Sequence, residues 1–196
     1  MNEAELARLP LNVIGKGEAD QPDLPIFDAR LRAVVRYADE AAWTTATAVA
    51  RAIDPVREIV AAARDSVAVL AVGDHGPQET MQALEKAARA GFSSPLRFPA
   101  GNPGSLVGVT CILFGFRGPT LNFTLPPQEG VPVGLEVAAQ WLRRRVVEYV
   151  VLSTCGIDAN TRPVTRSLLL ATDRSANHQG EPLTAADVAW LASVDA

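Results

Sequence analysis

The sequence has few of the side chains that metal, thiol or imidazole chemistry requires. Its 196 residues include two histidines and two cysteines, and aromatic residues make up 6% of the chain. The histidines and cysteines lack the close spacing of metal-binding motifs, so we expect no metal site and no cofactor. Cys111 and Cys155 lie far apart in apolar stretches. This pattern indicates reduced thiols in a cytoplasmic protein rather than a disulfide framework.

Long apolar runs and excess positive charge are also missing. No apolar run reaches the roughly 20 residues that a membrane-spanning helix needs. The first residues lack the basic, apolar and small-residue succession of a signal peptide. The formal net charge is −4, which argues against a nucleic-acid-binding surface. The sequence therefore predicts a cytoplasmic protein that neither spans a membrane nor binds nucleic acid.

The residues that are present favour one α/β domain over residues 1–196. Hydrophobic residues make up 48% of the chain, and the length suffices for a sizeable core. Six consecutive apolar residues at 67–72 predict a buried strand, and helical periodicity alternates with further apolar runs. Strands are predicted at 67–72, 119–124, 148–153 and 167–171, and helices at 40–53, 77–91, 103–114, 131–145 and after 184. The helix at 77–91 has an apolar face of Met81, Leu84, Ala87 and Ala88.

The two ends of the chain are predicted to be less regular. Residues 1–26 carry several prolines and glycines, so we expect a mostly irregular arm with a short strand at 11–14. Residues 173–180 form a polar loop. Thr184 and Asp187 resemble a capping pair that opens a final amphipathic helix.

The turn after residues 119–124 is the most informative segment. A strand-to-helix turn is where reactive groups gather in α/β folds, because the first helical N–H groups are unpaired there. This turn contains Pro126, Pro127, Gln128 and Glu129. None of them is a thiol or a hydroxyl, and two prolines remove two N–H donors. The turn is therefore predicted to hold no catalytic nucleophile.

Two neighbouring motifs carry a family resemblance. Asn102-Pro103-Gly104-Ser105-Leu106 and the run from Gly115 to Leu121, which includes Gly118-Pro119, resemble the N-terminal half of β-ketoacyl synthases. The resemblance covers roughly residues 30–172. When the sequences are aligned on Gly118-Pro119 and Gly130, the catalytic cysteine of that family falls on Pro127. The elbow is thus a degenerate form of the family's active-site turn.

The resemblance implies a three-layer, thiolase-like half-fold, with a central mixed sheet flanked by helices. The family has two similar halves, and this chain is long enough for the first. The second half supplies two catalytic histidines, and Asn177-His178 does not match them in place or surroundings. Chain-length factors of the family often carry glutamine at the nucleophile position, one residue from Gln128. The resemblance therefore implies a noncatalytic, chain-length-factor-like partner subunit in polyketide or fatty-acid-type biosynthesis.

The same resemblance implies a partner. In the family, the strand matching residues 119–124 pairs with its symmetry mate across a dimer. We expect a homodimer, or a heterodimer with an active ketosynthase, and an acyl carrier protein as a further partner. By strand alternation, Leu121, Phe123 and Leu125 face the core or partner helices. The predicted interface residues are Thr120, Leu121, Asn122, Phe123 and Thr124.

Two alternatives remain open at this point. The chain could instead process acyl thioesters, as a malonyl-carrier decarboxylase does, with Gln128 and Glu129 supplying hydrogen bonds or with Cys155 as a new nucleophile. A catalytic cysteine needs a base within reach, and the histidines are the candidates. Residues 143–145, three arginines, form either a solvated helix end or a docking point for an acidic carrier protein.

Overall fold

The protein is an α/β structure built on one mixed sheet. A computed structural model describes residues 3–6, 8–92, 94–157, 163–172 and 180–194. Six strands lie in the order β3-β2-β4-β5-β1-β6. Strand β2 is parallel to β3 and β4, and the other pairs are antiparallel. The strands are β1 (Asn12–Ala19), β2 (Val67–Val72), β3 (Thr120–Phe123), β4 (Tyr149–Ile157), β5 (Pro163–Ala171) and β6 (Glu181–Pro182).

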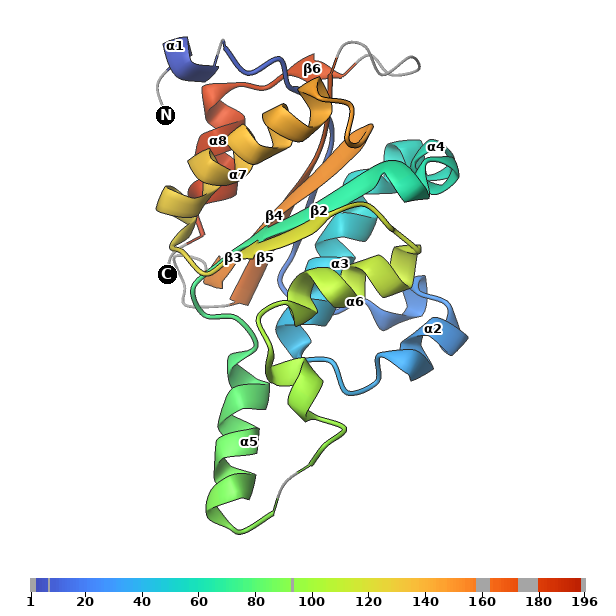
Figure 1. Ribbon diagram of the computed structural model, residues 1–196, viewed down its shortest axis with the longest axis vertical. Helices are drawn as coiled ribbons and strands as arrows, with labels where there is room; N and C mark the ends of the chain where they lie inside the picture. Colours follow the sequence, from blue (N-terminus) through green and yellow to red (C-terminus); the bar gives the residue numbers. More distant parts are fainter. Residues whose placement is uncertain (1–2, 7, 93, 158–162, 173–179, 195–196) are drawn as a thin grey trace.

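Helices cover both faces of the sheet and make it the middle of three layers (Figure 1). Helices α3 and α6 pack on one face, and α7 and α8 pack on the other. All six side chains of β2 are buried as a result, which explains its unbroken apolar sequence. The helices are α1 (Glu3–Leu6), α2 (Ala29–Val34), α3 (Glu40–Ile53), α4 (Arg57–Ala62), α5 (Gln78–Arg89), α6 (Ser105–Phe114), α7 (Pro127–Arg143) and α8 (Ala185–Ala192).

Several predicted elements are confirmed with nearly the same bounds. The predicted helix at 40–53 is α3, and the predicted strand at 67–72 is β2. The capping pair is confirmed, because Thr184 and Asp187 each accept a hydrogen bond from the other residue's backbone N–H. Helix α7 starts four residues earlier than predicted, since a proline is tolerated at the first helical position.

The prediction of a mostly irregular arm over residues 1–26 is wrong. The short strand expected there is the eight-residue β1, which pairs with β5 and lies inside the sheet. Its glycines allow α3 to approach closely: a Cβ on Gly17 would lie 2.1 Å from the carbonyl oxygen of Ala48. The predicted polar loop lies, for residues 173–179, outside the described residues.

No helix among the described residues combines the length and the apolar character needed to cross a membrane.

Candidate functional site

The elbow between β3 and α7 lies where the sequence predicts it. Pro126 precedes the helix, and Pro127 is its first residue and is buried. Gln128 and Glu129 follow in the first turn with exposed side chains. The position of the expected nucleophile is therefore occupied by a buried pyrrolidine ring that has no acidic proton.

The elbow also has few backbone donors. Pro126 and Pro127 have no N–H. The N–H groups of Glu129 and Gly130 both donate to the carbonyl oxygen of Pro126, each at 2.9 Å. Among the described residues, this leaves the N–H of Gln128 as the free donor of the turn. A developing oxyanion needs preorganised donors, so the elbow is poorly suited to acyl transfer.

Close packing fixes the elbow against the sheet. A Cβ on Gly130 would lie 2.3 Å from Cγ1 of Val72, and one on Gly134 would lie 2.9 Å from Cδ1 of Leu152. Both glycines face the sheet from α7, so the helix lies unusually near β2 and β4. The first turn of α7 therefore has no space to move closer to the sheet.

Strand β3 is the open edge of the sheet. Within the described part of the chain it pairs with β2 alone, and the ladder includes bonds from the N–H of Val69 to Pro119 and from the N–H of Gly73 to Phe123. Hydrogen bonds alternate along a parallel pair, so the N–H and C=O of Asn122 point away from β2. Leu121 is 40% exposed. The predicted interface residues therefore share one accessible edge.

The two faces of β3 are less distinct than alternation predicts. Thr120 and Leu121 are exposed, whereas Asn122 and Phe123 are half-buried. The side-chain oxygen Oδ1 of Asn122 is buried and has no hydrogen-bond partner within the described part of the chain. Within β3, burial therefore follows position along the strand rather than strict alternation.

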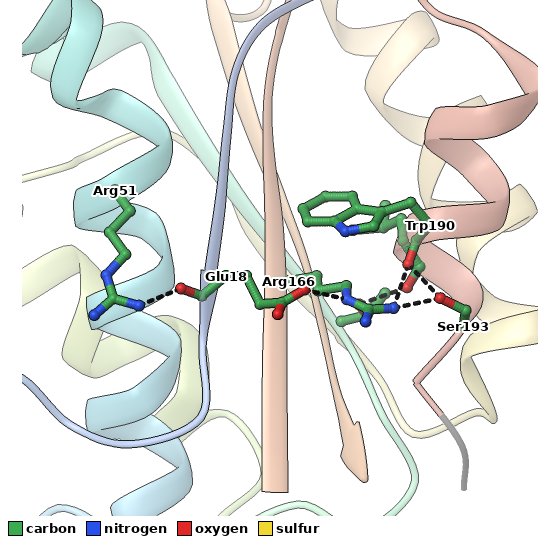
Figure 2. Close-up of polar contacts among 7 residues, drawn as sticks. Glu18, Arg51, Arg166, Trp190 and Ser193 are labelled. Carbon is green, nitrogen blue, oxygen red and sulfur yellow. Dashed lines mark hydrogen bonds and ion pairs between the residues drawn. The ribbon is translucent and has the colours of Figure 1, made fainter. Parts of the chain in front are cut away.

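On the other side of the sheet, side chains from α3 and β5 contact β1, the strand next to the edge strand β6. Figure 2 shows Arg51 of α3 donating to the carbonyl oxygen of Glu18 on β1. Nε of Arg166 on β5 lies 2.6 Å from the Glu18 carboxylate, and its Nη1 donates to the carbonyl oxygen of Trp190 at 2.8 Å and to Ser193. These contacts join β1 and β5 to α3 and α8.

Cys155 lies at the end of β4 beside a cavity of about 230 Å³. Its Sγ is 3.2 Å from Oγ1 of Thr45, and burial raises the pKa of the thiol although hydrogen bonds with Thr45 and Thr165 oppose that effect. His75 lines the same cavity, with Nδ1 2.7 Å from Oδ1 of Asp74. A buried, protonated thiol is typical of an inert cysteine, so the geometry gives little support to Cys155 as a nucleophile.

The structure leaves the other sequence candidates separate from the elbow. Residues 143–145 are exposed at the end of α7, and Arg145 has a left-handed φ of 56°. Asn177 and His178 lie outside the described residues. The expected core residue Cys111 is half-buried on α6. Within the described residues, no group of three His, Cys, Asp or Glu side chains could hold a metal ion.

Sequence reasoning missed Asp39. This buried residue caps α3 by accepting from the N–H of Ala41, and its other oxygen accepts from the N–H of Thr80 at 2.9 Å. It thus joins the start of α3 to the start of α5. An aspartate directly before a helical run is a capping signature, so the first bond was predictable and the second, long-range bond was not.

The half-buried thiol of Cys111 predicts a pH dependence of stability. Burial raises the pKa of Cys111 to about 11, from an ordinary value of 9.0. Below pH 9 the thiol is protonated in both the folded and the unfolded state, so it adds no pH dependence to the unfolding free energy. Between pH 9 and 11 the unfolded chain ionises while the folded chain does not, so the unfolding free energy falls with rising pH.

Between pH 8 and pH 10.5, we expect the unfolding free energy of the native protein to fall by about 1–2 kcal/mol more than the unfolding free energy of Cys111→Ala. Urea unfolding of both proteins at the two pH values measures the difference, and contributions from other titrating groups cancel. The same pH dependence in both proteins would contradict the burial of this thiol.

Comparisons with known proteins establish the fold. No protein-family model matches the sequence, and no curated protein matches it. Among solved structures, the chain is similar to an ishigamide ketosynthase/chain length factor (TM-score 0.67, 11% identity, 87% of this chain and 64% of that one). It is also similar to a type II polyketide acyl-carrier protein in complex with its ketosynthase bound to the hexaketide (TM-score 0.64, 16% identity, 85% of this chain and 63% of that one). A third match is the ketosynthase ApeO in complex with its chain length factor ApeC from Xenorhabdus doucetiae (TM-score 0.52, 16% identity, 82% of this chain and 73% of that one).

These matches support a ketosynthase half-domain fold at low sequence identity. The chain spans less than two thirds of the length of the first structures it matches. The predicted α/β fold with a mixed central sheet is confirmed.

Proposed function

We propose that this chain is a noncatalytic, chain-length-factor-like subunit that associates with an active ketosynthase in polyketide or fatty-acid-type biosynthesis. The observation that carries the proposal is that two features occur together at β3. The strand ends at an elbow without a nucleophile, and its free edge faces solvent. The chain would contribute binding surface to the assembly and leave bond formation to its partner.

The elbow supports the noncatalytic part of the proposal. Condensation through a covalent acyl intermediate needs an activated nucleophile and a neighbouring base. Pro127 can supply neither, and the two prolines leave one free N–H in the turn. The decarboxylase alternative also needs donors aimed at a developing enolate. The exposed side chains of Gln128 and Glu129 offer no such preorganised arrangement, so no observation favours that alternative.

The free edge of β3 supports the partner part of the proposal. Unpaired N–H and C=O groups on an edge strand are a template for pairing with another chain. Helix α6 packs against β3, and Leu121 on the strand is 40% exposed. An interface that includes the edge and the helices around it is expected to fall in the obligate range, with about 2,000 Å² or more buried in total.

Asn122→Pro tests this association. Because the N–H of Asn122 points away from β2, the substitution removes an outward donor and leaves the ladder to β2 intact. We expect the variant to bind a ketosynthase from the same organism at least tenfold more weakly. Sedimentation velocity at micromolar concentration, for the chain alone and for the mixture, measures the change.

Asn122→Ala is the matched control, because it removes the same side chain and retains the N–H. It should associate like the native protein. A native chain that sediments as a monomer both alone and in the mixture would remove the basis of the proposal.

A further inference from the structure

Helix α5 has few contacts with the rest of the protein. It projects from the end of β2 (Figure 1), and none of its residues is buried. It packs on the short helix Phe98–Gly101, where a Cβ on Gly101 would lie 2.9 Å from Cδ1 of Leu84. An element with so few buried contacts opens locally with a small change in free energy.

One hydrogen bond joins the start of α5 to the body of the protein. The N–H of Thr80 donates to Oδ2 of Asp39 at 2.9 Å, while Oδ1 of Asp39 accepts from the N–H of Ala41. Asp39 is 4% exposed, so water competes little for this bond. Over the described residues, it is the one hydrogen bond or ion pair between α5 and residues outside 76–92. We call it the Asp39–Thr80 latch.

The connection between β2 and α5 contains a glycine in a conformation that other residues rarely adopt. Gly76 has a left-handed φ of 56°, and a Cβ there would have no atom closer than 3.9 Å. Hinges in proteins are short segments that absorb large changes of φ and ψ. Glycine tolerates such changes, so α5 can swing about Gly76 when the latch is open.

The first turn of α5 lies between two cavities. The first has a volume of about 230 Å³ and is the cavity that Cys155 lines. The second has a volume of about 270 Å³ and is lined by Thr80. Asp39, Glu40 and Glu79 line both cavities. The two spaces therefore meet at the latch.

We propose that α5 is a lid held closed by the Asp39–Thr80 latch, and that opening the latch joins the two cavities and exposes Cys155 to small molecules. In the closed state, the first turn of α5 forms one wall of the Cys155 cavity, and the other walls include the start of α3 and the ends of β4 and β5. When α5 swings about Gly76, its wall moves away and the others stay in place.

The position of the cavity gives the lid its importance. The cavity lies beyond the carboxyl end of β2 and beside that of β4, and open α/β sheets bind ligands at the carboxyl ends of their strands. The lid thus controls entry to this end of the sheet. The inference does not depend on the association proposed for β3, and its test needs no partner protein.

Modification of Cys155 by a small thiol reagent measures how often the lid is open. The reporter is the full chain with Cys111→Ala, treated with methyl methanethiosulfonate, and intact-mass spectrometry follows the reaction. When the lid recloses faster than the reagent reacts, the rate is proportional to the population of the open state. We expect slow modification of the reporter protein, since Cys155 is 7% exposed.

Two substitutions that remove the latch should raise the rate equally. Thr80→Pro removes the N–H that donates to Asp39, in the first turn of α5, where the helix itself does not use that donor. Asp39→Ser keeps an oxygen that can cap α3 and removes the one that accepts from Thr80. Each should raise the rate at least tenfold, because a hydrogen bond to a carboxylate is lost. The double variant should react no faster than either single variant, since both remove the same bond.

Thr80→Ala is the matched control, because it removes the same side chain and retains the N–H. It should react at the rate of the reporter protein. In Thr80→Pro and Asp39→Ser, hydrogen exchange should accelerate in α5 and remain unchanged in α7. This comparison separates opening of the lid from a loss of global stability.

Three outcomes would overturn the proposal. One is a Thr80→Pro protein that reacts at the rate of the reporter protein. Another is a double variant whose rate shows the product of the two single effects, because the two substitutions would then act through different contacts. The third is an equal acceleration of hydrogen exchange in α7 and α5, because the thiol would then become accessible through unfolding of the domain.

Discussion

Gly17→Ala is expected to lower the unfolding free energy by about 3 kcal/mol or more, at the upper end of the cost of overpacking. A Cβ at this position would lie 2.1 Å from the carbonyl oxygen of Ala48 and 2.5 Å from the backbone nitrogen of Ala52. Both atoms belong to the backbone of α3, so no side chain can rotate away. Either α3 must move off the sheet or β1 must leave its place between β5 and β6.

Gly108→Ala is the control for this prediction. It also adds one methyl group to a glycine, but into open space within a helix. Alanine is favoured over glycine in a helix interior by roughly 0.5–1 kcal/mol, so this variant should be slightly more stable than the native protein. Urea unfolding followed by circular dichroism measures both. A Gly17→Ala variant as stable as the native protein would contradict the close approach of α3 to β1.

The same glycines explain why β1 was hard to predict. Gly15-Lys16-Gly17 interrupts the apolar alternation of a strand, and its composition is typical of a loop. The need for glycine comes from α3, which lies about 30 residues further along the chain. Helix α3 and strand β2 were predictable because their signals are local. The helix is rich in alanine, and six consecutive apolar residues define the strand.

The candidate site likewise has some features with a local sequence signal and others that depend on distant parts of the chain. The elbow follows from local residues, since Pro126 and Pro127 fix both its turn and its lack of donors. The sequence also gives the amphipathic character of α5, but periodicity cannot show whether anything covers the apolar face. The bond from the N–H of Thr80 to Asp39 depends on the path of the chain from β2 into α5. Such groupings are properties of the tertiary fold and have no local signal.

The attachment of α8 depends on polar contacts as well as on packing. Oγ1 of Thr154 on β4 donates to the carbonyl oxygen of Leu191, and Arg166 on β5 donates to that of Trp190. These carbonyls lie in the last turn of α8, where acceptors need partners from outside the regular helical ladder, and the carbonyl oxygen of Trp190 also accepts from Ser193. Arg166 also lies over the ring of Trp190, with its guanidinium carbon 5.5 Å from the ring centre. One guanidinium thus joins β1, β5 and α8 (Figure 2).

Arg166→Met should therefore lower the unfolding free energy by about 2 kcal/mol, the usual range for hydrogen bonds to a charged group. The arginine side chain is only 16% exposed, and its loss removes its ion pair with Glu18 and one of the donors to the carbonyl oxygen of Trp190, which also accepts from Ser193. Hydrogen exchange in α8 should accelerate more than in α3. The control is Arg57→Met, which removes an exposed ion pair to Asp54 and should change stability by less than about 0.5 kcal/mol. Equal effects of the two substitutions would show that Arg166 does not hold α8 to the sheet.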